Sequence, residues 1–137
     1  MQPVTSDDPL AIFAKTPFTR LLGMQRDHSE GGKAQISLDP RAELGNVIGA
    51  VHGGVVVTLL DVVMASAAVS RVNFQKTVVT LNLDTSFLAP GRGLLTAQGE
   101  VLACDDDVAW CQAQVCDAQG RVVAKAQGSF RYLPRPA

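Results

Sequence analysis

The chain has 137 residues, of which 47% are hydrophobic and 18% charged, and its formal net charge is −1. This length suits one domain with one core, and the composition excludes a disordered chain. A charge near zero without any Lys/Arg-rich block argues against nucleic-acid binding. We therefore expect a single domain over residues 1–137, with residues 1–17 as an N-terminal helix and linker and 134–137 as a frayed tail.

The N-terminal sequence and the cysteines indicate the cellular compartment in which the protein is expected. The sequence MQPVTSDDPLAIF lacks a basic segment followed by an apolar one, so we expect no signal peptide. No apolar run reaches about 18 residues without a charge, which argues against a membrane-spanning helix. The three cysteines show neither CxxC spacing nor nearby histidines. We expect no metal site, and we expect reduced thiols in the cytoplasm that serve as small core residues.

The first third of the chain predicts a short helix and a hairpin. Residues 6–15 suit a helix that Ser6 or Asp7 can cap and that Pro17 ends. Strands at about 24–29 and 33–38 follow, joined by a Gly31-Gly32 turn that tolerates positive φ. A loop then runs from residue 39 to about residue 51.

Residues 53–72 form the only long helix that the pattern predicts. Its length and its Ala-rich second half favour a helix over a strand. A helix without a polar side has to lie in the interior. Apolar residues occupy all of its sides: Val55, Val56, Val57, Leu59, Leu60, Val62, Val63, Met64, Ala65, Ala67, Ala68 and Val69.

Four further strands are predicted, at about 76–89, 94–104, 108–117 and 121–132. The segments between them, 90–93, 105–107 and 117–120, carry Pro, Gly and Asp, which favour turns. Such short connections predict antiparallel neighbours.

The inward faces of three of these strands carry unusually small residues. Strand alternation places them on one side of the sheet, where they leave room for a bulky object. The apolar helix is that object, so we expect a curved antiparallel sheet around one buried helix. The faces are Leu95, Ala97, Gly99, Val101 and Ala103; Ala109, Cys111, Ala113 and Val115; and Val122, Ala124, Ala126, Gly128 and Phe130.

The start of the long helix could bind a negatively charged oxygen. The first helical N–H groups lack intrahelical partners, and the helix dipole adds positive charge there. Gly53 and Gly54 would let a ligand come close to the backbone, as the oxyanion of acyl transfer requires. The other interpretation is that the two glycines only make a tight turn into the helix.

Asp61 places a carboxylate inside this apolar helix. It lies eight residues after Gly53, which is roughly 12 Å along the helix axis. One carbonyl group cannot reach both residues of one chain, so a shared substrate would need two chains with an active site at their interface. Alternatively, a structural hydrogen bond or salt bridge satisfies Asp61.

His52 and Asn46 complete the polar set. His52 could act as a general acid or base, position a loop or ligand, or be a satisfied core histidine. Its place directly before the glycines favours a positioning role. Asn46 lies in the loop that returns to the helix start and could donate a hydrogen bond to a substrate carbonyl.

The combination Asn46-x5-His52-Gly53-Gly54-x6-Asp61 resembles the hotdog-fold acyl-CoA thioesterases, in particular the phenylacetate-pathway branch. The stretch VVTLNLDTSFLAPGRG also resembles a strand of that family, and the resemblance spans about residues 18–133. It implies an α+β hotdog fold and hydrolysis of an acyl- or aryl-CoA without metal or cofactor. The implied assembly is a homodimer that often pairs into a homotetramer.

The resemblance also implies roles for individual residues. Asp61 acts as general base or nucleophile, the Gly53 amide binds the thioester oxygen with Gly54 beside it, Asn46 polarises that group, and His52 orients the site. Some relatives place a Ser or Thr near the Asp, and Thr80 matches it. Regular alternation would group Thr80 with Asn82, away from the helix, unless a bulge or an interface intervenes; a solvated polar face is the other interpretation.

Two other functions remain open, a hotdog enoyl-CoA hydratase or dehydratase and a non-catalytic acyl-CoA binding module. Surface bases that could meet the coenzyme A phosphates are Arg71, Lys76, Arg92 and Arg121. The sequence does not distinguish an aryl from a short or medium alkyl acyl group.

Overall fold

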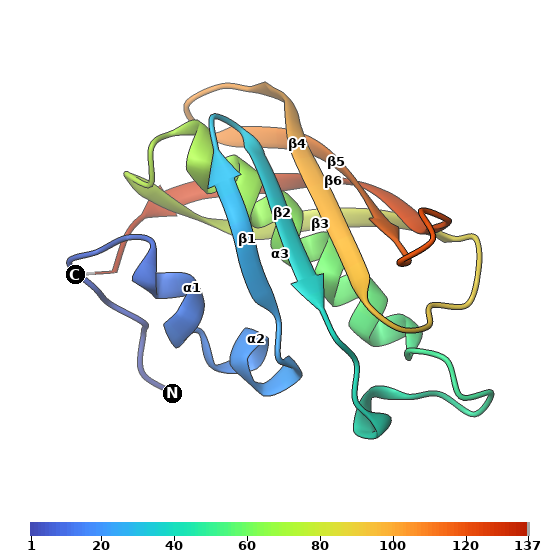
Figure 1. Cartoon of the computed structure of the whole chain (residues 1–137). Coiled ribbons are helices and arrows are strands. Elements are labelled where there is room, and N and C mark those ends of the chain that lie inside the picture. The colour runs from blue at the N-terminus through green and yellow to red at the C-terminus, as the bar shows by residue number, and fades with distance from the viewer. Residues whose placement is uncertain (137) are drawn as a thin grey trace.

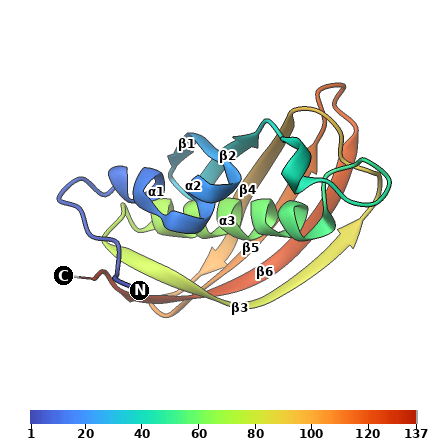
Figure 2. The same cartoon turned by 90° about the horizontal axis from the view of Figure 1, so that it is seen from below.

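The computed structural model describes residues 1–136, in which one six-stranded antiparallel sheet curves around one long helix (Figure 1). This confirms the expected hotdog architecture. The long helix is α3 (Gly53–Arg71), and two short helices, α1 (Ala11–Lys15) and α2 (Pro17–Leu22), lie beside it (Figure 2). A 3₁₀ turn spans Ala42–Leu44. The strands are β1 (Gln25–Glu30), β2 (Lys33–Leu38), β3 (Lys76–Phe87), β4 (Leu95–Cys104), β5 (Val108–Cys116) and β6 (Val122–Pro134).

The small inward residues of the sheet do make room for α3. A side chain at Gly99 would place its Cβ only 3.0 Å from the carbonyl oxygen of Val63 in the helix, so the close approach needs glycine. Ala103 is an exception, because a bulge between Val101 and Ala103 turns it to the solvent. The other small side chains are buried as expected: Ala97, Ala109, Cys111, Ala113, Ala124 and Ala126.

The helix is the centre of the core. Length and apolar composition alone would allow α3 to cross a membrane. In this fold, however, the sheet encloses it, and Leu59, Leu60 and Val63 are fully buried. Among the cysteines, only Cys111 is fully inside; burial, with a smaller effect of Cys104, raises the pKa of the Cys111 thiol to about 12.

The two ends of the chain differ from the sequence-based expectation. The N-terminal segment contains two helices rather than one, because Pro17 is the first residue of α2. At the other end, β6 continues to Pro134, and the Arg135 guanidinium donates to the carbonyl oxygens of Phe74 (3.0 Å) and Ser6 (3.4 Å). The tail expected to fray is therefore held as far as Arg135, and residue 137 lies outside the described part.

The strand order is β1-β2-β4-β5-β6-β3, so β3 and β4 are not neighbours. The prediction that the short 90–93 connection joins adjacent strands was wrong. The connection crosses the end of the intervening strands: the N–H groups of Leu88 and Ala89 bond the carbonyl of Val123, and the Gly91 carbonyl accepts from Val51. As a result, β3 is an edge strand beside the helix.

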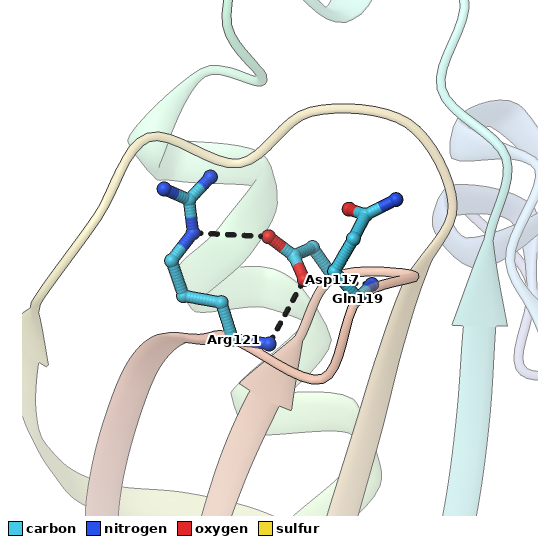
Figure 3. Close-up of polar contacts among 3 residues, drawn as sticks. All are labelled: Asp117, Gln119 and Arg121. Carbon is cyan, nitrogen blue, oxygen red and sulfur yellow. Dashed lines mark hydrogen bonds and ion pairs between the residues drawn. The ribbon is translucent and has the colours of Figure 1, made fainter.

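The β5–β6 turn is organised by one buried carboxylate (Figure 3). Asp117 accepts hydrogen bonds from the backbone N–H groups of Gln119 (3.0 Å) and Arg121 (2.9 Å), and from the Arg121 Nε–H (3.1 Å). Burial acts to raise the pKa of Asp117, but these bonds and the nearby charge outweigh it and hold the pKa below its usual value.

In β3 and β1, further bulges decide which side chains face the helix. In β3, Thr80 pairs with Phe130 and Asn82 with Ser129, so Leu81 is an extra residue. In β1, Arg26 pairs with Ile36 and His28 with Gln35, so Asp27 is extra. Each bulge reverses the alternation along its strand.

Candidate functional site

The first turn of α3 leaves one backbone donor free. The His52 carbonyl accepts from the N–H groups of Val55 (2.9 Å) and Val56 (3.2 Å). The Gly54 N–H donates to His52 Nδ1 at 2.8 Å. Only the Gly53 N–H of this turn lacks a partner within residues 1–136. A free amide at the positive end of a 19-residue helix suits an oxygen that carries negative charge.

His52 therefore caps the helix through its side chain. Because Nδ1 accepts a hydrogen bond, the neutral ring carries its proton on Nε2, which can donate to another group. The bond also occupies the Gly54 amide, so this N–H is not a free donor for a substrate, and a role of Gly54 in substrate binding stays a prediction. The exposed imidazole suits a positioning role better than that of a core histidine.

Asn46 organises the loop that leads to the helix. Its Oδ1 accepts from the N–H groups of Ile48 (3.1 Å) and Ala50 (2.9 Å), which leaves the Nδ2 hydrogens as free donors among the described residues. The His52 N–H bonds the carbonyl of Leu44 at 2.8 Å, so the loop closes back onto the start of α3. The amide of Asn46 and the N–H of Gly53 belong to this one loop-and-helix unit.

Asp61 makes a short hydrogen bond with Thr80. The Thr80 hydroxyl donates to Asp61 Oδ1 at 2.6 Å. Regular alternation would have turned Thr80 away, but the bulge at Leu81 places it on the inner side of β3. No cation lies within 4.0 Å of Asp61; the ion pairs within residues 1–136 are Arg41–Glu43 and Arg121–Asp117. One oxygen of the half-buried carboxylate is thus held, and the other is free to contact a ligand or water.

The carboxylate lines a cavity of about 490 Å³ between α3, β3 and the N-terminal helices. Asp61, Ala65 and Val69 of α3, which recur at helical spacing, line it together with Phe13 of α1. The sequence had given residues 1–17 no place in the site. The apolar side of α1 could have indicated that this helix covers something, but not what it covers.

The structure does not bring the two parts of the expected site together within one chain. Asp61 contacts Thr80, which lies in the first half of β3 (Lys76–Phe87), whereas Gly53 lies beside the last residue of that strand: a Cβ at Gly53 would be 3.5 Å from the Phe87 ring. Strand β3 therefore runs alongside α3 in the opposite direction. The Gly53 part lies at the end of the edge strand, and the Asp61 part lies nearer its middle.

Three of the four bases considered for the coenzyme A phosphates have partners in the chain. Arg92 donates to the carbonyl oxygens of Gly49 (2.8 Å) and Ile48 (3.3 Å), and Arg121 pairs with Asp117. Lys76 donates to the carbonyl of Asp106 and lies over the Tyr132 ring. Arg71 is exposed at the end of α3.

Known proteins resemble this chain over most of its length. The sequence profile described as thioesterase superfamily matches residues 48–124. A Saccharolobus solfataricus protein with the provisional name of esterase is 32% identical over 133 residues, covering 93% of this chain and 94% of the relative. The structure of a Mycobacterium tuberculosis protein, also provisionally named an esterase, has a TM-score of 0.81 at 27% identity and covers 89% of this chain and 100% of that one. The E. coli PaaI protein from the phenylacetic acid degradation operon shares the fold, with a TM-score of 0.83 at 22% identity, and covers 92% of this chain and 91% of its own.

Proposed function

The chain belongs to the thioesterase superfamily, and on this premise we propose that it hydrolyses acyl- or aryl-CoA thioesters at a site that two copies of the chain build together. The observation that carries the proposal is the pair of complementary groups on α3. The Gly53 N–H has no partner among residues 1–136, and the Asp61 carboxylate is held by Thr80, with its other oxygen unbonded among the same residues.

These groups suit the chemistry of thioester hydrolysis. The Gly53 N–H and the helix dipole stabilise negative charge on the thioester oxygen, with the Asn46 amide as a second donor. Asp61 as general base takes a proton from water while the water oxygen bonds to the carbonyl carbon. The tetrahedral intermediate then re-forms its carbonyl, the C–S bond breaks, and the thiolate takes the proton from Asp61. Asp61 as nucleophile would instead bond to the carbonyl carbon and expel the thiolate of coenzyme A. Water would then hydrolyse the resulting anhydride to the free acid and Asp61. Neither route needs a metal or cofactor.

The edge strand supports a site shared between two chains. β3 has a hydrogen-bonded neighbour only on its β6 side, and Val79, Leu81 and Phe87 on it are exposed apolar residues. Antiparallel pairing of two β3 strands across a two-fold axis would cover this edge. If the two-fold axis passes through Asp84 and Leu81 remains an extra residue, Thr80 of one chain lies opposite Phe87 of the other, and paired side chains share a face. Asp61 of one chain then faces Gly53 of its partner. The dimer is the minimum this proposal needs, and a homotetramer in the cytoplasm is our expectation.

A thiol-release assay tests the activity. Purified protein is given a panel of aryl- and alkyl-CoA thioesters, and free coenzyme A is measured with and without the Asp61→Asn change. We expect release by the wild-type protein and a loss of turnover in the variant. Water addition to an enoyl-CoA without thiol release would instead support the hydratase. Saturable binding of acyl-CoA without either reaction would support the binding module.

A further inference from the structure

The cavity beside Asp61 has an excess of positive charge. Three bases line it, Arg26, Lys76 and Arg135, and Asp61 is the only acid among its lining residues. None of the three bases forms an ion pair within residues 1–136. A pocket for a purely hydrocarbon acyl group has no use for this charge, because partly buried cations without counter-ions are unfavourable.

Two of these bases are guanidinium groups with unused donors: Arg135 is bonded to the carbonyl oxygens of Phe74 and Ser6, whereas Arg26 is held by Ser29 of its own strand. The Arg26 Nε–H donates to Ser29 Oγ at 2.8 Å, and one Nη donates to the Ser29 carbonyl at 3.3 Å. These bonds use two of the five N–H groups of a guanidinium and fix its orientation. The remaining three have no partner among residues 1–136, although the side chain is half-buried and lines the cavity.

The bulge in β1 explains why Arg26 faces inward. Positions 26 and 29 would lie on opposite faces of a regular strand; they share the inner face because Asp27 is an extra residue. The Asp27 carboxylate accepts from Gln35 Nε2 (3.0 Å) and Ser37 Oγ (3.0 Å) on the outer face. Asp27 therefore does not line the cavity, and its carboxylate is already bonded on the outer face.

We propose that Arg26 is a specificity-determining residue that binds an anionic group, a carboxylate in the simplest case, on the acyl part of the substrate. The substrate class is then a thioester whose acyl group carries a second acid function away from the thioester carbonyl. The inference rests on the proposed function, since it concerns the acyl end of the same site. A guanidinium with free donors binds a carboxylate through charge-assisted hydrogen bonds.

Matched pairs of substrates test this proposal. Hexanoyl-CoA is compared with adipoyl-CoA, and phenylacetyl-CoA with 4-carboxyphenylacetyl-CoA, so that shape is similar within each pair. We expect the wild-type kcat/KM to favour the carboxylated member by about ten- to a hundredfold, the range of a charge-assisted hydrogen bond. Arg26→Gln should bring the ratio close to one, and Arg26→Lys should keep part of it. Arg131→Gln, which removes an exposed base on β6 that does not line the cavity, should leave the ratio unchanged.

The same pairs as N-acetylcysteamine thioesters, which lack the phosphates of coenzyme A, distinguish the two possible anions. A preference that persists there and disappears in Arg26→Gln supports the proposal. A variant that loses rate equally for both members of the CoA pairs, but not with the short carrier, would show that Arg26 binds a phosphate and would overturn it. Hydrolysis of both members at equal rates by the wild-type protein also overturns it while leaving the proposed function intact. Absence of any thioester hydrolysis overturns both.

Discussion

The first turn of α3 and the turn that carries Asp61 belong to one helix, but their surroundings are opposite. His52 and Gly54 are exposed, and the free Gly53 amide lies near the surface. Asp61 is half-buried, bonded by Thr80, and lines a cavity under α1. The start of α3 offers a hydrogen-bond donor near the surface. The turn with Asp61 offers a carboxylate that lines a cavity, but no backbone donor for an oxyanion. Each supplies what the other lacks, which is the pattern expected of a site completed by a partner chain.

Removing the carboxylate should have the largest effect. Asp61→Asn keeps the size of the side chain but cannot accept a proton, so we expect kcat to fall by about 10²- to 10⁴-fold. The measurement is coenzyme A release, with circular dichroism to show that the fold persists. Asp39→Asn, an exposed acid after β2, is the matched control. Near wild-type turnover in Asp61→Asn would remove Asp61 from the mechanism.

Removing the donor should have the next largest effect. Gly53→Pro lacks the N–H but is acceptable at the first position of a helix, so we expect kcat to fall by about 10²- to 10³-fold with the helix retained. Gly53→Ala keeps the N–H, and its Cβ would meet nothing closer than the Phe87 ring at 3.5 Å. Equal losses in the two variants would mean that space at Gly53, rather than its hydrogen bond, is what matters.

Mixing these two inactive proteins tests whether the parts come from different chains. In a hybrid dimer of Asp61→Asn and Gly53→Pro, one site has both groups intact and the other has neither. Random exchange makes half of the dimers hybrid, so about a quarter of the wild-type activity should return. Verified hybrids without recovery would place both parts of the site in one chain.

Removing the hydrogen bond that orients the Asp61 carboxylate should lower kcat by less than removing the carboxylate itself. Thr80→Val removes the 2.6 Å hydrogen bond to Asp61 while keeping the shape of the side chain. We expect kcat to fall by about tenfold, because the carboxylate remains but is less well oriented. Thr80→Ser keeps the hydroxyl and should restore most of the rate. A Thr80→Val enzyme with wild-type kcat would reduce Thr80 to a structural residue.

A substitution away from both Gly53 and Asp61 should change the thermal stability of the fold and leave the activity unchanged. Asp117→Asn weakens the β5–β6 turn, and we expect unchanged kcat with a lower Tm at pH 7. Because the pKa of Asp117 is lowered in the folded state, its contribution is fully present above the unfolded value, about 3.9, and is lost as the pH falls through the folded value. The difference in Tm between the wild-type protein and Asp117→Asn should therefore become smaller below about pH 4. A constant difference across that range would show that the charge is irrelevant.

Much of the fold could be predicted from the composition and from the spacing of apolar residues along the sequence. The apolar helix at 53–72, the small inward residues and the turn residues were enough to predict a sheet curved around a helix. They were not enough to predict the strand order, since a connection of a few residues can cross the ends of intervening strands when a sheet is strongly curved. Pro17 was interpreted as the end of a helix, although proline is equally suited to begin one.

The site was predicted less completely than the fold. The sequence singled out Gly53 and Asp61. In the structure, Gly53 is the first residue of α3 and Asp61 lines the cavity. Arg26 escaped notice because nothing in QRDHSE reveals which way its side chain points. A bulge depends on pairing with a distant strand, so it leaves no signal in the strand's own residues. His52 was expected to orient the site, but its bond to the Gly54 amide could not be foreseen from spacing.

The extra residue in β3 has a consequence for comparing sequences. Thr80 and Asn82 pair with consecutive residues of β6, and Leu81 between them has no partner. A relative that lacks a residue at this point would have an unbroken ladder, and its Thr or Ser would still face the helix. The number of residues between this hydroxyl and the Pro90-Gly91 turn can therefore differ by one between proteins with the same site. An alignment that forbids a gap within the strand would match Thr80 to the wrong residue.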